Sequence, residues 1–264
     1  LLGQQSILIN EMNEGELSIL YSEIHKMTMR LKEQTDLLLA DKRGLTTAIE
    51  DIFHQLRTPM TAMNLTISLL ADENLTYEKR IRLTHDLKRQ TEKVSWLVDS
   101  LLKMSKIGSQ SAVFQNTLVS VKSLIDKATS PFLVQMELKD IIFKTDIHDE
   151  SFTGDMLWSA EAFGNLLKNA VEHTAPGGTI CVTANETTLY TEIIVSDNGE
   201  GFTQEDIPHL FERFYKGKNA TQGSIGIGLA LSRAIIIAQN GTIAAKNNAE
   251  GGAEFVVKFY KTVV

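Results

Sequence analysis

IEDIFHQLRTPMTAMNLTISLL, residues 49–70, is the stretch that decides how the first part of this chain folds. Its apolar residues recur at alternating intervals of four and three, which is the spacing of a coiled-coil seam. The seam consists of Ile49, Phe53, Leu56, Met60, Met63, Ile67 and Leu70. A helix with such a seam buries it against other helices, so the stretch predicts a helical bundle.

A second helix with the same pattern follows a break. Residues 71–76, ADENLT, interrupt the first seam, and the alternating spacing then resumes. The second seam consists of Leu83, Leu87, Gln90, Val94, Leu97, Leu101 and Met104. Two antiparallel helices joined by a short turn leave their seams half exposed, and the pairing of two such hairpins into a four-helix bundle buries both. We therefore expect a homodimer built on residues 45–105.

An earlier coiled-coil segment precedes this hairpin. Its seam consists of Leu20, Ile24, Met27, Leu31, Gln34 and Leu38. Leu45, Ile49 and Phe53 are then spaced by four and four, which is a stutter that locally unwinds a coiled coil. A local change in helix packing is therefore expected just before the hairpin.

The pattern changes after a Gly- and Ser-containing linker at residues 107–111. Alternating strands and helices follow, which predicts a mixed α/β domain at residues 113–264. The expected strands are Ile141–Phe143, Thr179–Val182, Thr191–Val195, Thr242–Ala245 and Phe255–Phe259. The expected helices are Val121–Met136, Met156–His173 and Ile227–Ala238.

Composition excludes several classes of protein. The 264 residues are 43% hydrophobic and 22% charged, as in ordinary globular domains. The net charge of -7 argues against a nucleic-acid-binding protein. Cys181 is the single cysteine, so no internal disulfide forms. No run of 18 apolar residues and no secretory signal peptide is present, and because the chain begins at Leu1 we expect a fragment of a longer protein.

His54 is the first candidate for chemistry. It follows Phe53 by one position, about 100° around the helix, so it should point away from the seam toward solvent. Pro59 lacks an N–H, so the carbonyl of Gln55 loses its partner and the helix should bend there. Neutral imidazole is a good nucleophile near neutral pH. An exposed helical histidine is nevertheless more often an ordinary surface residue.

Two further groups of polar residues lie in the α/β part. Asn165 and Asn169 are four positions apart on one helix face, where their amide oxygens could ligate Mg²⁺ or simply face solvent. Asp197 ends a predicted strand and is followed by Gly199 and Gly201, which allow a tight turn and a close approach to a ligand. The Asp197 carboxylate could accept a hydrogen bond from an exocyclic amine, although the same pattern is also that of a plain turn.

A glycine run opens the last predicted helix. GSIGIGL, residues 223–229, offers backbone N–H groups and a helix N-terminus to phosphate. No Gly-Lys-Ser/Thr follows, so the run is not a P-loop. It is not a dinucleotide-binding fingerprint either, because the first strand of the α/β part lies far upstream.

These patterns occur in a specific order. His-x-x-x-Thr-Pro from His54, Asn-x-x-x-Asn from Asn165, Asp-x-Gly-x-Gly from Asp197, the Phe-rich residues 211–216 and Gly-x-Gly-Leu from Gly226 follow one another. In this order they resemble the H, N, G1, F and G2 boxes of the sensor histidine kinases. The resemblance covers residues 45–264, and residues 241–243 and 251–255 are similar to the family's terminal strands.

The resemblance implies a multidomain protein. Residues 1–44 would be a juxtamembrane linker and coiled-coil signalling helix, and residues 45–107 an all-α antiparallel helical hairpin that dimerises as a four-helix bundle and carries the phosphoacceptor. Residues 113–264 would be an α/β sandwich of the Bergerat type that binds ATP and Mg²⁺. The implied partners are a second copy of the chain and the receiver domain of a response regulator, with no nucleic acid. The chain would be the cytoplasmic part of a bacterial cell-membrane protein anchored upstream of residue 1.

The resemblance also implies roles for single residues. His54 would accept the γ-phosphoryl group of ATP and pass it to an aspartate of the response regulator. Asn169 would ligate Mg²⁺, and Asp197 would bind the adenine amino group. Lys216 and Lys218, in a lid at residues 211–225, would neutralise charge on the phosphoryl group. The remaining nucleotide-binding residues would be Asn165, Lys168, His173, Gly199, Gly201, Phe211, Gly226, Ile227, Gly228 and Leu229.

Gln55 departs from the family pattern. Relatives carry Glu or Asp directly after the phosphoacceptor, and that acid is thought to accept the imidazole proton. A neutral amide cannot act as a general base, although it can orient the ring. Thr58, one turn after His54, occupies the position that in relatives places the water for dephosphorylating the partner. A dimeric, ATP-binding scaffold or phosphatase-leaning protein with weak kinase activity is therefore the alternative to an active kinase. A free-standing ATPase of the Hsp90 or MutL kind is disfavoured by the histidine-bearing hairpin.

Overall fold

The computed structural model describes residues 16–72, 74–109, 111–219 and 224–261, with the side chains of residues 16, 17 and 37–49 left outside the description. The sequence predictions that involve residues 1–15, Gly223, the lid residues 220–222 and the side chains of Leu38, Leu45 and Ile49 lie outside the described residues. The chain forms two compact units, which divide between His54 and Gln55.

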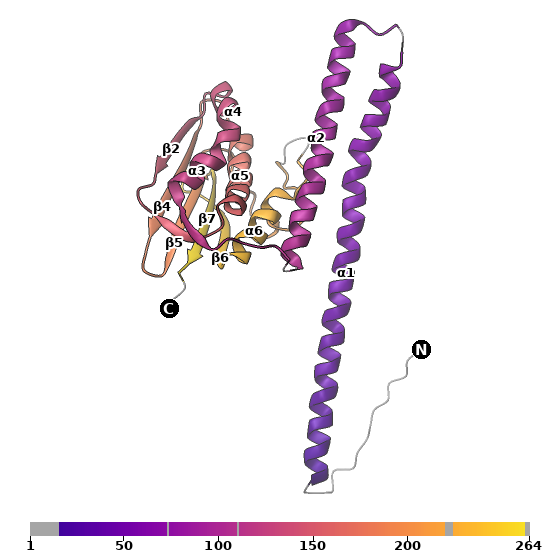
Figure 1. Ribbon diagram of the computed structural model, residues 1–264, viewed down its shortest axis with the longest axis vertical. Helices are drawn as coiled ribbons and strands as arrows, with labels where there is room; N and C mark the ends of the chain where they lie inside the picture. Colours follow the sequence, from indigo (N-terminus) through magenta and orange to yellow (C-terminus); the bar gives the residue numbers. More distant parts are fainter. Residues whose placement is uncertain (1–15, 73, 110, 220–223, 262–264) are drawn as a thin grey trace. The chain divides into compact units, whose positions relative to one another are not determined.

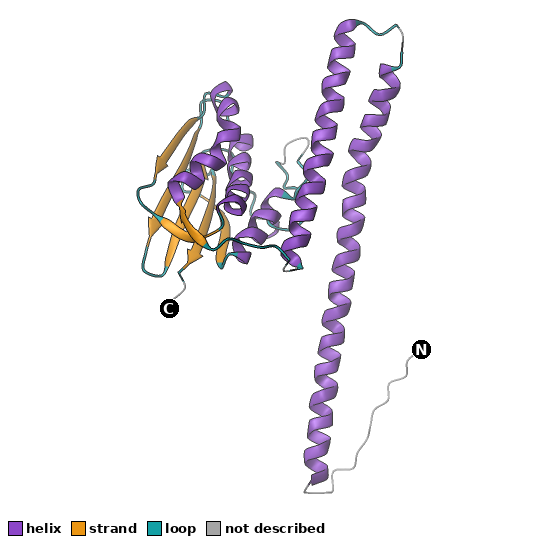
Figure 2. Ribbon diagram, viewed as in Figure 1, coloured by secondary structure: helices purple, strands orange, loops and turns teal. Residues whose placement is uncertain are grey.

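Two long helices form the first part of the chain (Figures 1 and 2). Helix α1 spans Glu16–Leu70 and continues through Pro59, and helix α2 spans Tyr77–Gly108. Thr76 caps α2, because its side chain accepts a hydrogen bond from the backbone N–H of Lys79. The predicted hairpin, with its break at residues 71–76, is thus confirmed. Over the described residues, no helix has both the length and the apolar character needed to cross a lipid bilayer.

The seams of the two helices are covered to different degrees. On α2, Leu97 and Met104 are only 0% and 6% exposed. On α1, Leu56 and Met63 are partly covered, and Met63 lies beside α2, with its sulfur 3.6 Å from the Thr91 hydroxyl. The intervening seam residues of α1 are exposed: Phe53, Met60 and Ile67, at 63%, 53% and 53%. A single copy of the chain therefore covers only part of the α1 seam.

The α/β domain is built on a five-stranded sheet with the order β2-β4-β5-β7-β6. Strands β2 and β4 are parallel, and the other neighbours are antiparallel. The strands are β2 (Ile142–Asp146), β4 (Thr179–Glu186), β5 (Tyr190–Asp197), β6 (Gly241–Asn247) and β7 (Ala253–Tyr260). All five expected strands are present. Two short strands that the sequence patterns missed, β1 (Thr117–Ser120) and β3 (Ser151–Gly154), form a separate antiparallel pair.

Helices cover one face of this sheet (Figure 1). They are α3 (Val121–Thr129), α4 (Leu133–Leu138), α5 (Met156–His173) and α6 (Gly228–Ala238). The prediction of one helix over Val121–Met136 was wrong, because a 3₁₀ turn at Ser130–Phe132 separates α3 from α4. Pro131 explains the interruption, since proline removes a backbone donor and clashes with the preceding turn of an α-helix.

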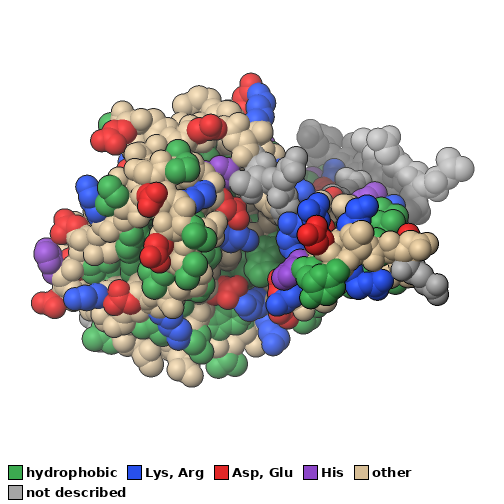
Figure 3. Space-filling view, turned by 90° about the horizontal axis from the view of Figure 1, so that it is seen from above, with side chains coloured by type: hydrophobic (Ala, Val, Ile, Leu, Met, Phe, Trp, Pro, Cys, Tyr) green, Lys and Arg blue, Asp and Glu red, His purple; other side chains and the backbone are tan. Residues whose placement is uncertain are grey.

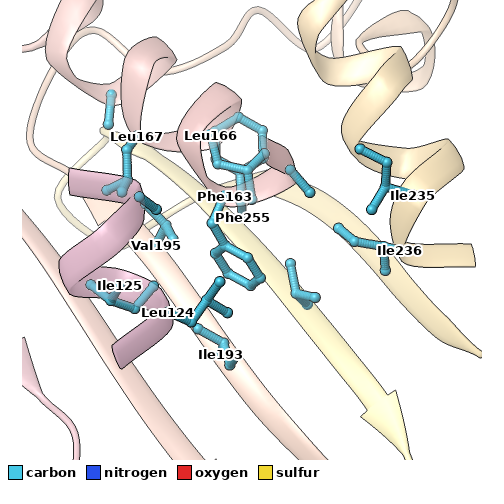
Figure 4. Close-up of a cluster of buried hydrophobic side chains, with 14 of the residues drawn as sticks. Leu124, Ile125, Phe163, Leu166, Leu167, Ile193, Val195, Ile235, Ile236 and Phe255 are labelled. Atoms are coloured by element: carbon cyan, nitrogen blue, oxygen red, sulfur yellow. The ribbon is translucent and has the colours of Figure 1, made fainter. Parts of the chain in front are cut away.

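The core lies between the helices and the sheet (Figure 4). Residues of β5 and β7 alternate between buried and partly exposed, as expected when one face of a sheet is covered. Phe163 of α5 and Phe255 of β7 are fully buried and lie near one another. Leu97 and Met104 of α2 belong to the same cluster of buried side chains, and α2 contacts α6. The second half of α2 is thus packed onto the α/β domain.

Candidate functional site

A cavity of about 580 Å³ lies among α2, α5 and the segment that joins β5 to α6. Nine of the residues singled out from the sequence line it: Asn165, Lys168, Asn169, His173, Gly201, Lys216, Gly226, Gly228 and Leu229. The fold therefore brings together residues from four separate motifs. It also adds residues that the motifs did not mark, among them Phe202, Asp206 and Leu210.

Helix α5 presents the two asparagines to the cavity. Asp155 starts this helix by accepting hydrogen bonds from the backbone N–H groups of Leu157 and Trp158. The amide nitrogen of Asn165 and the amide oxygen of Asn169 are both buried and lack a hydrogen-bond partner within the described part of the chain. Because an unpartnered buried polar atom is costly, these two atoms are suited to a ligand that supplies the missing interactions.

The Asp197 carboxylate, at the end of β5, has hydrogen-bond donors at only one of its two oxygens. The residue is 4% exposed, and Oδ1 accepts hydrogen bonds from the backbone N–H groups of Gly199 (2.9 Å) and Ala253 (3.2 Å). Among the described residues no donor reaches Oδ2. Burial raises the pKa of this carboxyl group, with the two backbone donors opposing the rise. The free oxygen is placed to accept a hydrogen bond from a ligand amine.

The glycine run at residues 223–229 contributes Gly226 and Gly228 to the wall of the cavity. Gly226 has a φ of +77°, and a Cβ there would lie 2.4 Å from the carbonyl oxygen of Tyr215. Only glycine tolerates this combination of backbone conformation and close approach. The carbonyl of Gly226 accepts a hydrogen bond from the Phe214 N–H at 2.8 Å. Gly228 then begins α6 at the cavity wall.

Four basic residues line the cavity. Lys168 comes from α5 and Lys216 from the segment before α6, whereas Arg89 and Lys93 come from α2. Burial lowers the pKa of Lys93, and the charges of Lys216, Arg89 and Lys168 lower it further. The sequence patterns missed Arg89, Lys93 and Trp96, although their spacing of four and three marks a stripe beside the apolar seam of α2.

Asp206 organises the segment before α6. The hydroxyl of Tyr215 donates to its carboxylate at 2.6 Å, which raises the pKa of Tyr215 to about 12 and lowers that of Asp206. The backbone N–H of Lys218 donates to the same carboxylate at 3.3 Å. The Lys218 side chain pairs with Glu205 at 2.7 Å and does not line the cavity.

Several residues singled out from the sequence lie elsewhere. His54 and Thr58 are exposed on α1, and Gln55 accepts a hydrogen bond from the Lys216 ammonium group at 3.4 Å. Phe211 packs edge-on toward Phe255, with ring centres 6.5 Å apart. Asp197, Gly199 and Ile227 do not line the cavity, although Ala253, whose backbone N–H donates to Asp197, does.

Two family models match the chain. Residues 154–263 match the histidine kinase-, DNA gyrase B- and HSP90-like ATPase, and residues 45–110 match the His Kinase A (phospho-acceptor) domain. The chain belongs to the sensor histidine kinases. A sensor histidine kinase combines both modules, so the match over the hairpin separates this chain from free-standing ATPases with the same α/β fold.

Other sensor histidine kinases resemble the chain over most of its length. Heme sensor protein HssS from Staphylococcus saprophyticus is 26% identical over 254 residues, which cover 96% of this chain and 53% of HssS. The chain spans about half the length of the curated relatives it matches. Histidine kinase AdeS from Acinetobacter baumannii shares the fold with a TM-score of 0.68 and 23% identity, over 80% of this chain and 98% of AdeS. Histidine kinase ThkA, solved in complex with response regulator protein TrrA, shares it with a TM-score of 0.61 and 21% identity, over 95% of this chain and 68% of that one.

Proposed function

We propose that this chain is the catalytic part of a protein histidine kinase, which transfers the γ-phosphoryl group of ATP to His54 and then to an aspartate of a response regulator. The observation that carries the proposal is a pair of buried oxygens without a donor: Asn169 Oδ1 at the cavity, and Oδ2 of Asp197, which is hydrogen-bonded to the lining residue Ala253. A carboxylate oxygen fits the exocyclic amine of adenine, and an amide oxygen fits Mg²⁺.

The cavity supports one arrangement of the nucleotide. The base would lie toward Asp197 and the phosphates toward Gly226 and Gly228, where backbone N–H groups open α6. Asn169, with Asn165 beside it, would hold Mg²⁺, which supplies charge neutralisation at the phosphate oxygens. Lys168, His173 and Lys216 line the same cavity and would add further contacts to the phosphates.

The proposed reaction forms one bond and breaks another. A ring nitrogen of His54 bonds to the γ-phosphorus, the bond from that phosphorus to the bridging oxygen breaks, and ADP leaves with the electron pair. The imidazole must then release the proton on its other nitrogen. Gln55 cannot accept this proton, because an amide is not a general base, so we infer that Gln55 orients the ring and that a different group or water takes the proton.

The alternative is a protein that binds ATP but phosphorylates poorly and acts as a phosphatase or dimeric scaffold. The replacement of the family's acidic residue by Gln55 favours it. Thr58 lies one helical turn beyond His54, where we propose that it positions water for dephosphorylation of the response regulator. The kinase and phosphatase roles are compatible in one protein, and Gln55 would shift the balance toward the second.

The exposed part of the α1 seam supports a homodimer. Phe53, Met60 and Ile67 follow one another at intervals of seven, so they form one continuous stripe on the helix. We propose that a second copy of the chain covers this stripe in a four-helix bundle. Ile67→Glu should convert the dimer to a monomer in light scattering, whereas Asn64→Glu, an exposed position off the stripe, should not.

We propose the rest of the assembly by analogy with relatives. Residues 1–44 would be a signalling linker, residues 45–107 the dimerisation and phosphotransfer domain, and residues 113–264 the ATP-binding domain. ThkA was solved with a response regulator, which supports a receiver domain as the partner of the hairpin. We also propose a membrane anchor upstream of residue 1, as expected for a sensor.

The first experiment is incubation with γ-labelled ATP and Mg²⁺, followed by a test for acid-labile, base-stable label on the protein. The unsubstituted chain should take up label, His54→Ala should take up none, and Gln55→Glu should take it up faster. Label that persists in His54→Ala would contradict the assignment of the acceptor. Absence of label from all three proteins, with ATP still bound, would favour the scaffold or phosphatase.

A further inference from the structure

One wall of the cavity belongs to the phosphotransfer hairpin and not to the α/β domain. Arg89, Lys93 and Trp96 of α2 line it opposite the α5 residues Asn165 and Asn169. These three α2 residues are spaced by four and three, so they share one face of the helix. The motifs singled out in the sequence of the α/β domain supply none of this wall.

Buried packing holds this face of α2 at the cavity. Leu97, the neighbour of Trp96, is fully buried in the same core as the α/β domain. The ammonium group of Lys168 lies 5.1 Å from the centre of the Trp96 ring, a cation–π contact. Two turns farther on, Lys103 pairs with Glu161 of α5 at 2.8 Å. These contacts of Trp96, Leu97 and Lys103 hold the part of α2 just beyond Lys93 against the α/β domain.

The charges around the cavity are unbalanced. Its lining contains the cations Arg89, Lys93, Lys168 and Lys216 but only two carboxylates, Glu172 and Asp206. Asp206 already accepts the Tyr215 hydroxyl and the Lys218 backbone N–H. Basic and acidic side chains both border the hollow in Figure 3, whereas the lining of the cavity itself has more cations than carboxylates. Repulsion within this group, which contributes to the lowered pKa of Lys93, would be relieved by a polyanion.

We propose that Lys93, with Arg89 beside it, binds the terminal phosphates of the nucleotide, so that α2 completes the ATP site from the side opposite the α/β domain. This inference rests on the proposed function, because it takes ATP to be the ligand of the cavity. An ammonium group facing a phosphate provides a charge-assisted contact. Nucleotide binding would then also strengthen the packing of α2 on the α/β domain, since the phosphates would bridge cations of both.

The test is calorimetric titration of the full chain with the imidotriphosphate analogue of ATP, and with AMP, in the presence of Mg²⁺. Lys93→Gln should weaken binding of the analogue about tenfold, the usual cost of losing one charge-assisted contact, and should leave AMP binding unchanged. Lys93→Arg keeps the charge and should stay within about twofold of the unsubstituted chain. Lys88→Gln is the matched control, because Lys88 lies on the same helix, is 74% exposed and does not line the cavity.

The outcomes separate this inference from the proposed function. Unchanged binding of the analogue by Lys93→Gln, or an equal loss for AMP, would overturn the inference, since a phosphate contact acts only on the longer nucleotide. If Asp197→Asn abolishes binding of both nucleotides while Lys93→Gln alters neither, the nucleotide site stands and only the role of α2 fails. If the unsubstituted chain binds neither nucleotide, both the proposed function and this inference are contradicted.

Discussion

The two ends of the cavity are built from different parts of the chain. At one end, Asp197, Gly199 and Ala253 belong to the sheet and its connections, and backbone N–H groups fix the carboxylate. At the other end, Lys93 and Lys216 reach the cavity from α2 and from the segment before α6. The first end is formed within the α/β domain, whereas the second depends on how α2 and the segment before α6 come together. Substitutions at the first end should therefore decide whether a nucleotide binds, and those at the second should adjust how tightly.

Gly252→Ala tests the rigidity of the first end and should have the largest effect. A Cβ at this position would lie 2.0 Å from the carbonyl oxygen of Asp197, and 2.7 and 2.8 Å from the backbone atoms Asp197 C and Asn198 Cα. We expect roughly 3 kcal/mol of lost stability in urea denaturation, because neither backbone can move without disturbing the sheet. Gly251→Ala is the control: nothing lies within 4 Å of its Cβ, and only its φ of +90° is strained, so it should cost about 1 kcal/mol. Equal costs would show that this end is not rigid.

Asp197→Asn separates binding from stability at the same end. The amide oxygen can still accept from Gly199 and Ala253, but an NH₂ group replaces the oxygen that we assign to adenine. ATP affinity should fall about a hundredfold, equivalent to about 2.7 kcal/mol, in a competition assay with a fluorescent nucleotide. The melting temperature at pH 7 should not fall, because the substitution removes a buried charge.

The difference in melting temperature between Asp197→Asn and the unsubstituted chain should depend on pH. Burial raises the pKa of Asp197, so the folded chain binds this proton more tightly than the unfolded chain. The ionised group therefore costs stability above the raised pKa, and this cost disappears below the unfolded value of about 3.9. Any advantage of Asp197→Asn in melting temperature should shrink as the pH falls toward 4. An advantage that grows would contradict the assignment.

Lys139→Met tests how α5 is held between the two ends. The Lys139 ammonium group donates to the carbonyl oxygens of Val171, Glu172 and Thr174, at 2.7, 3.3 and 3.2 Å, and so satisfies the C-terminal turn of α5. Removing this charge should cost about 2 kcal/mol in chemical denaturation. Lys144→Met, on the exposed side of β2, should change stability by less than about 0.5 kcal/mol. A cost no larger than that of the control would mean that water replaces the ammonium group.

Tyr215→Phe probes the second end and should have the smallest effect. It removes the hydroxyl that lowers the pKa of Asp206. A lowered carboxyl pKa stabilises the fold above the unfolded value of about 3.9 and ceases to do so as the pH falls through the folded value. The difference in melting temperature between the two proteins should thus be constant from pH 7 to 5 and shrink below pH 4. A difference that persists at pH 3 would point to packing of the ring.

The apolar spacing was enough to predict both long helices and the turn between them, because a repeat of four and three fits only a helical seam. The strands expected at Thr191–Val195 and Phe255–Phe259 are likewise present, as β5 and β7. Strands β1 and β3 were missed since four residues carry too little periodicity, and the division between α3 and α4 was missed because a local proline overrode the helical pattern. The roles of His54, Gln55 and Thr58 remain predictions.

The sequence by itself determined the order of the motifs, the seams and the chemistry of each candidate side chain, since these depend on spacing along one helix or strand. Only the tertiary structure decided which of these residues share a cavity and which atoms are left unsatisfied there. It also brought Lys93 and Trp96 of α2 to face α5, across more than seventy intervening positions that no local pattern connects. The contacts between α2 and α5 form because Leu97 and Met104 of the α2 seam are buried against the α/β domain. Which residues are buried depends on the whole fold and not on spacing along one helix.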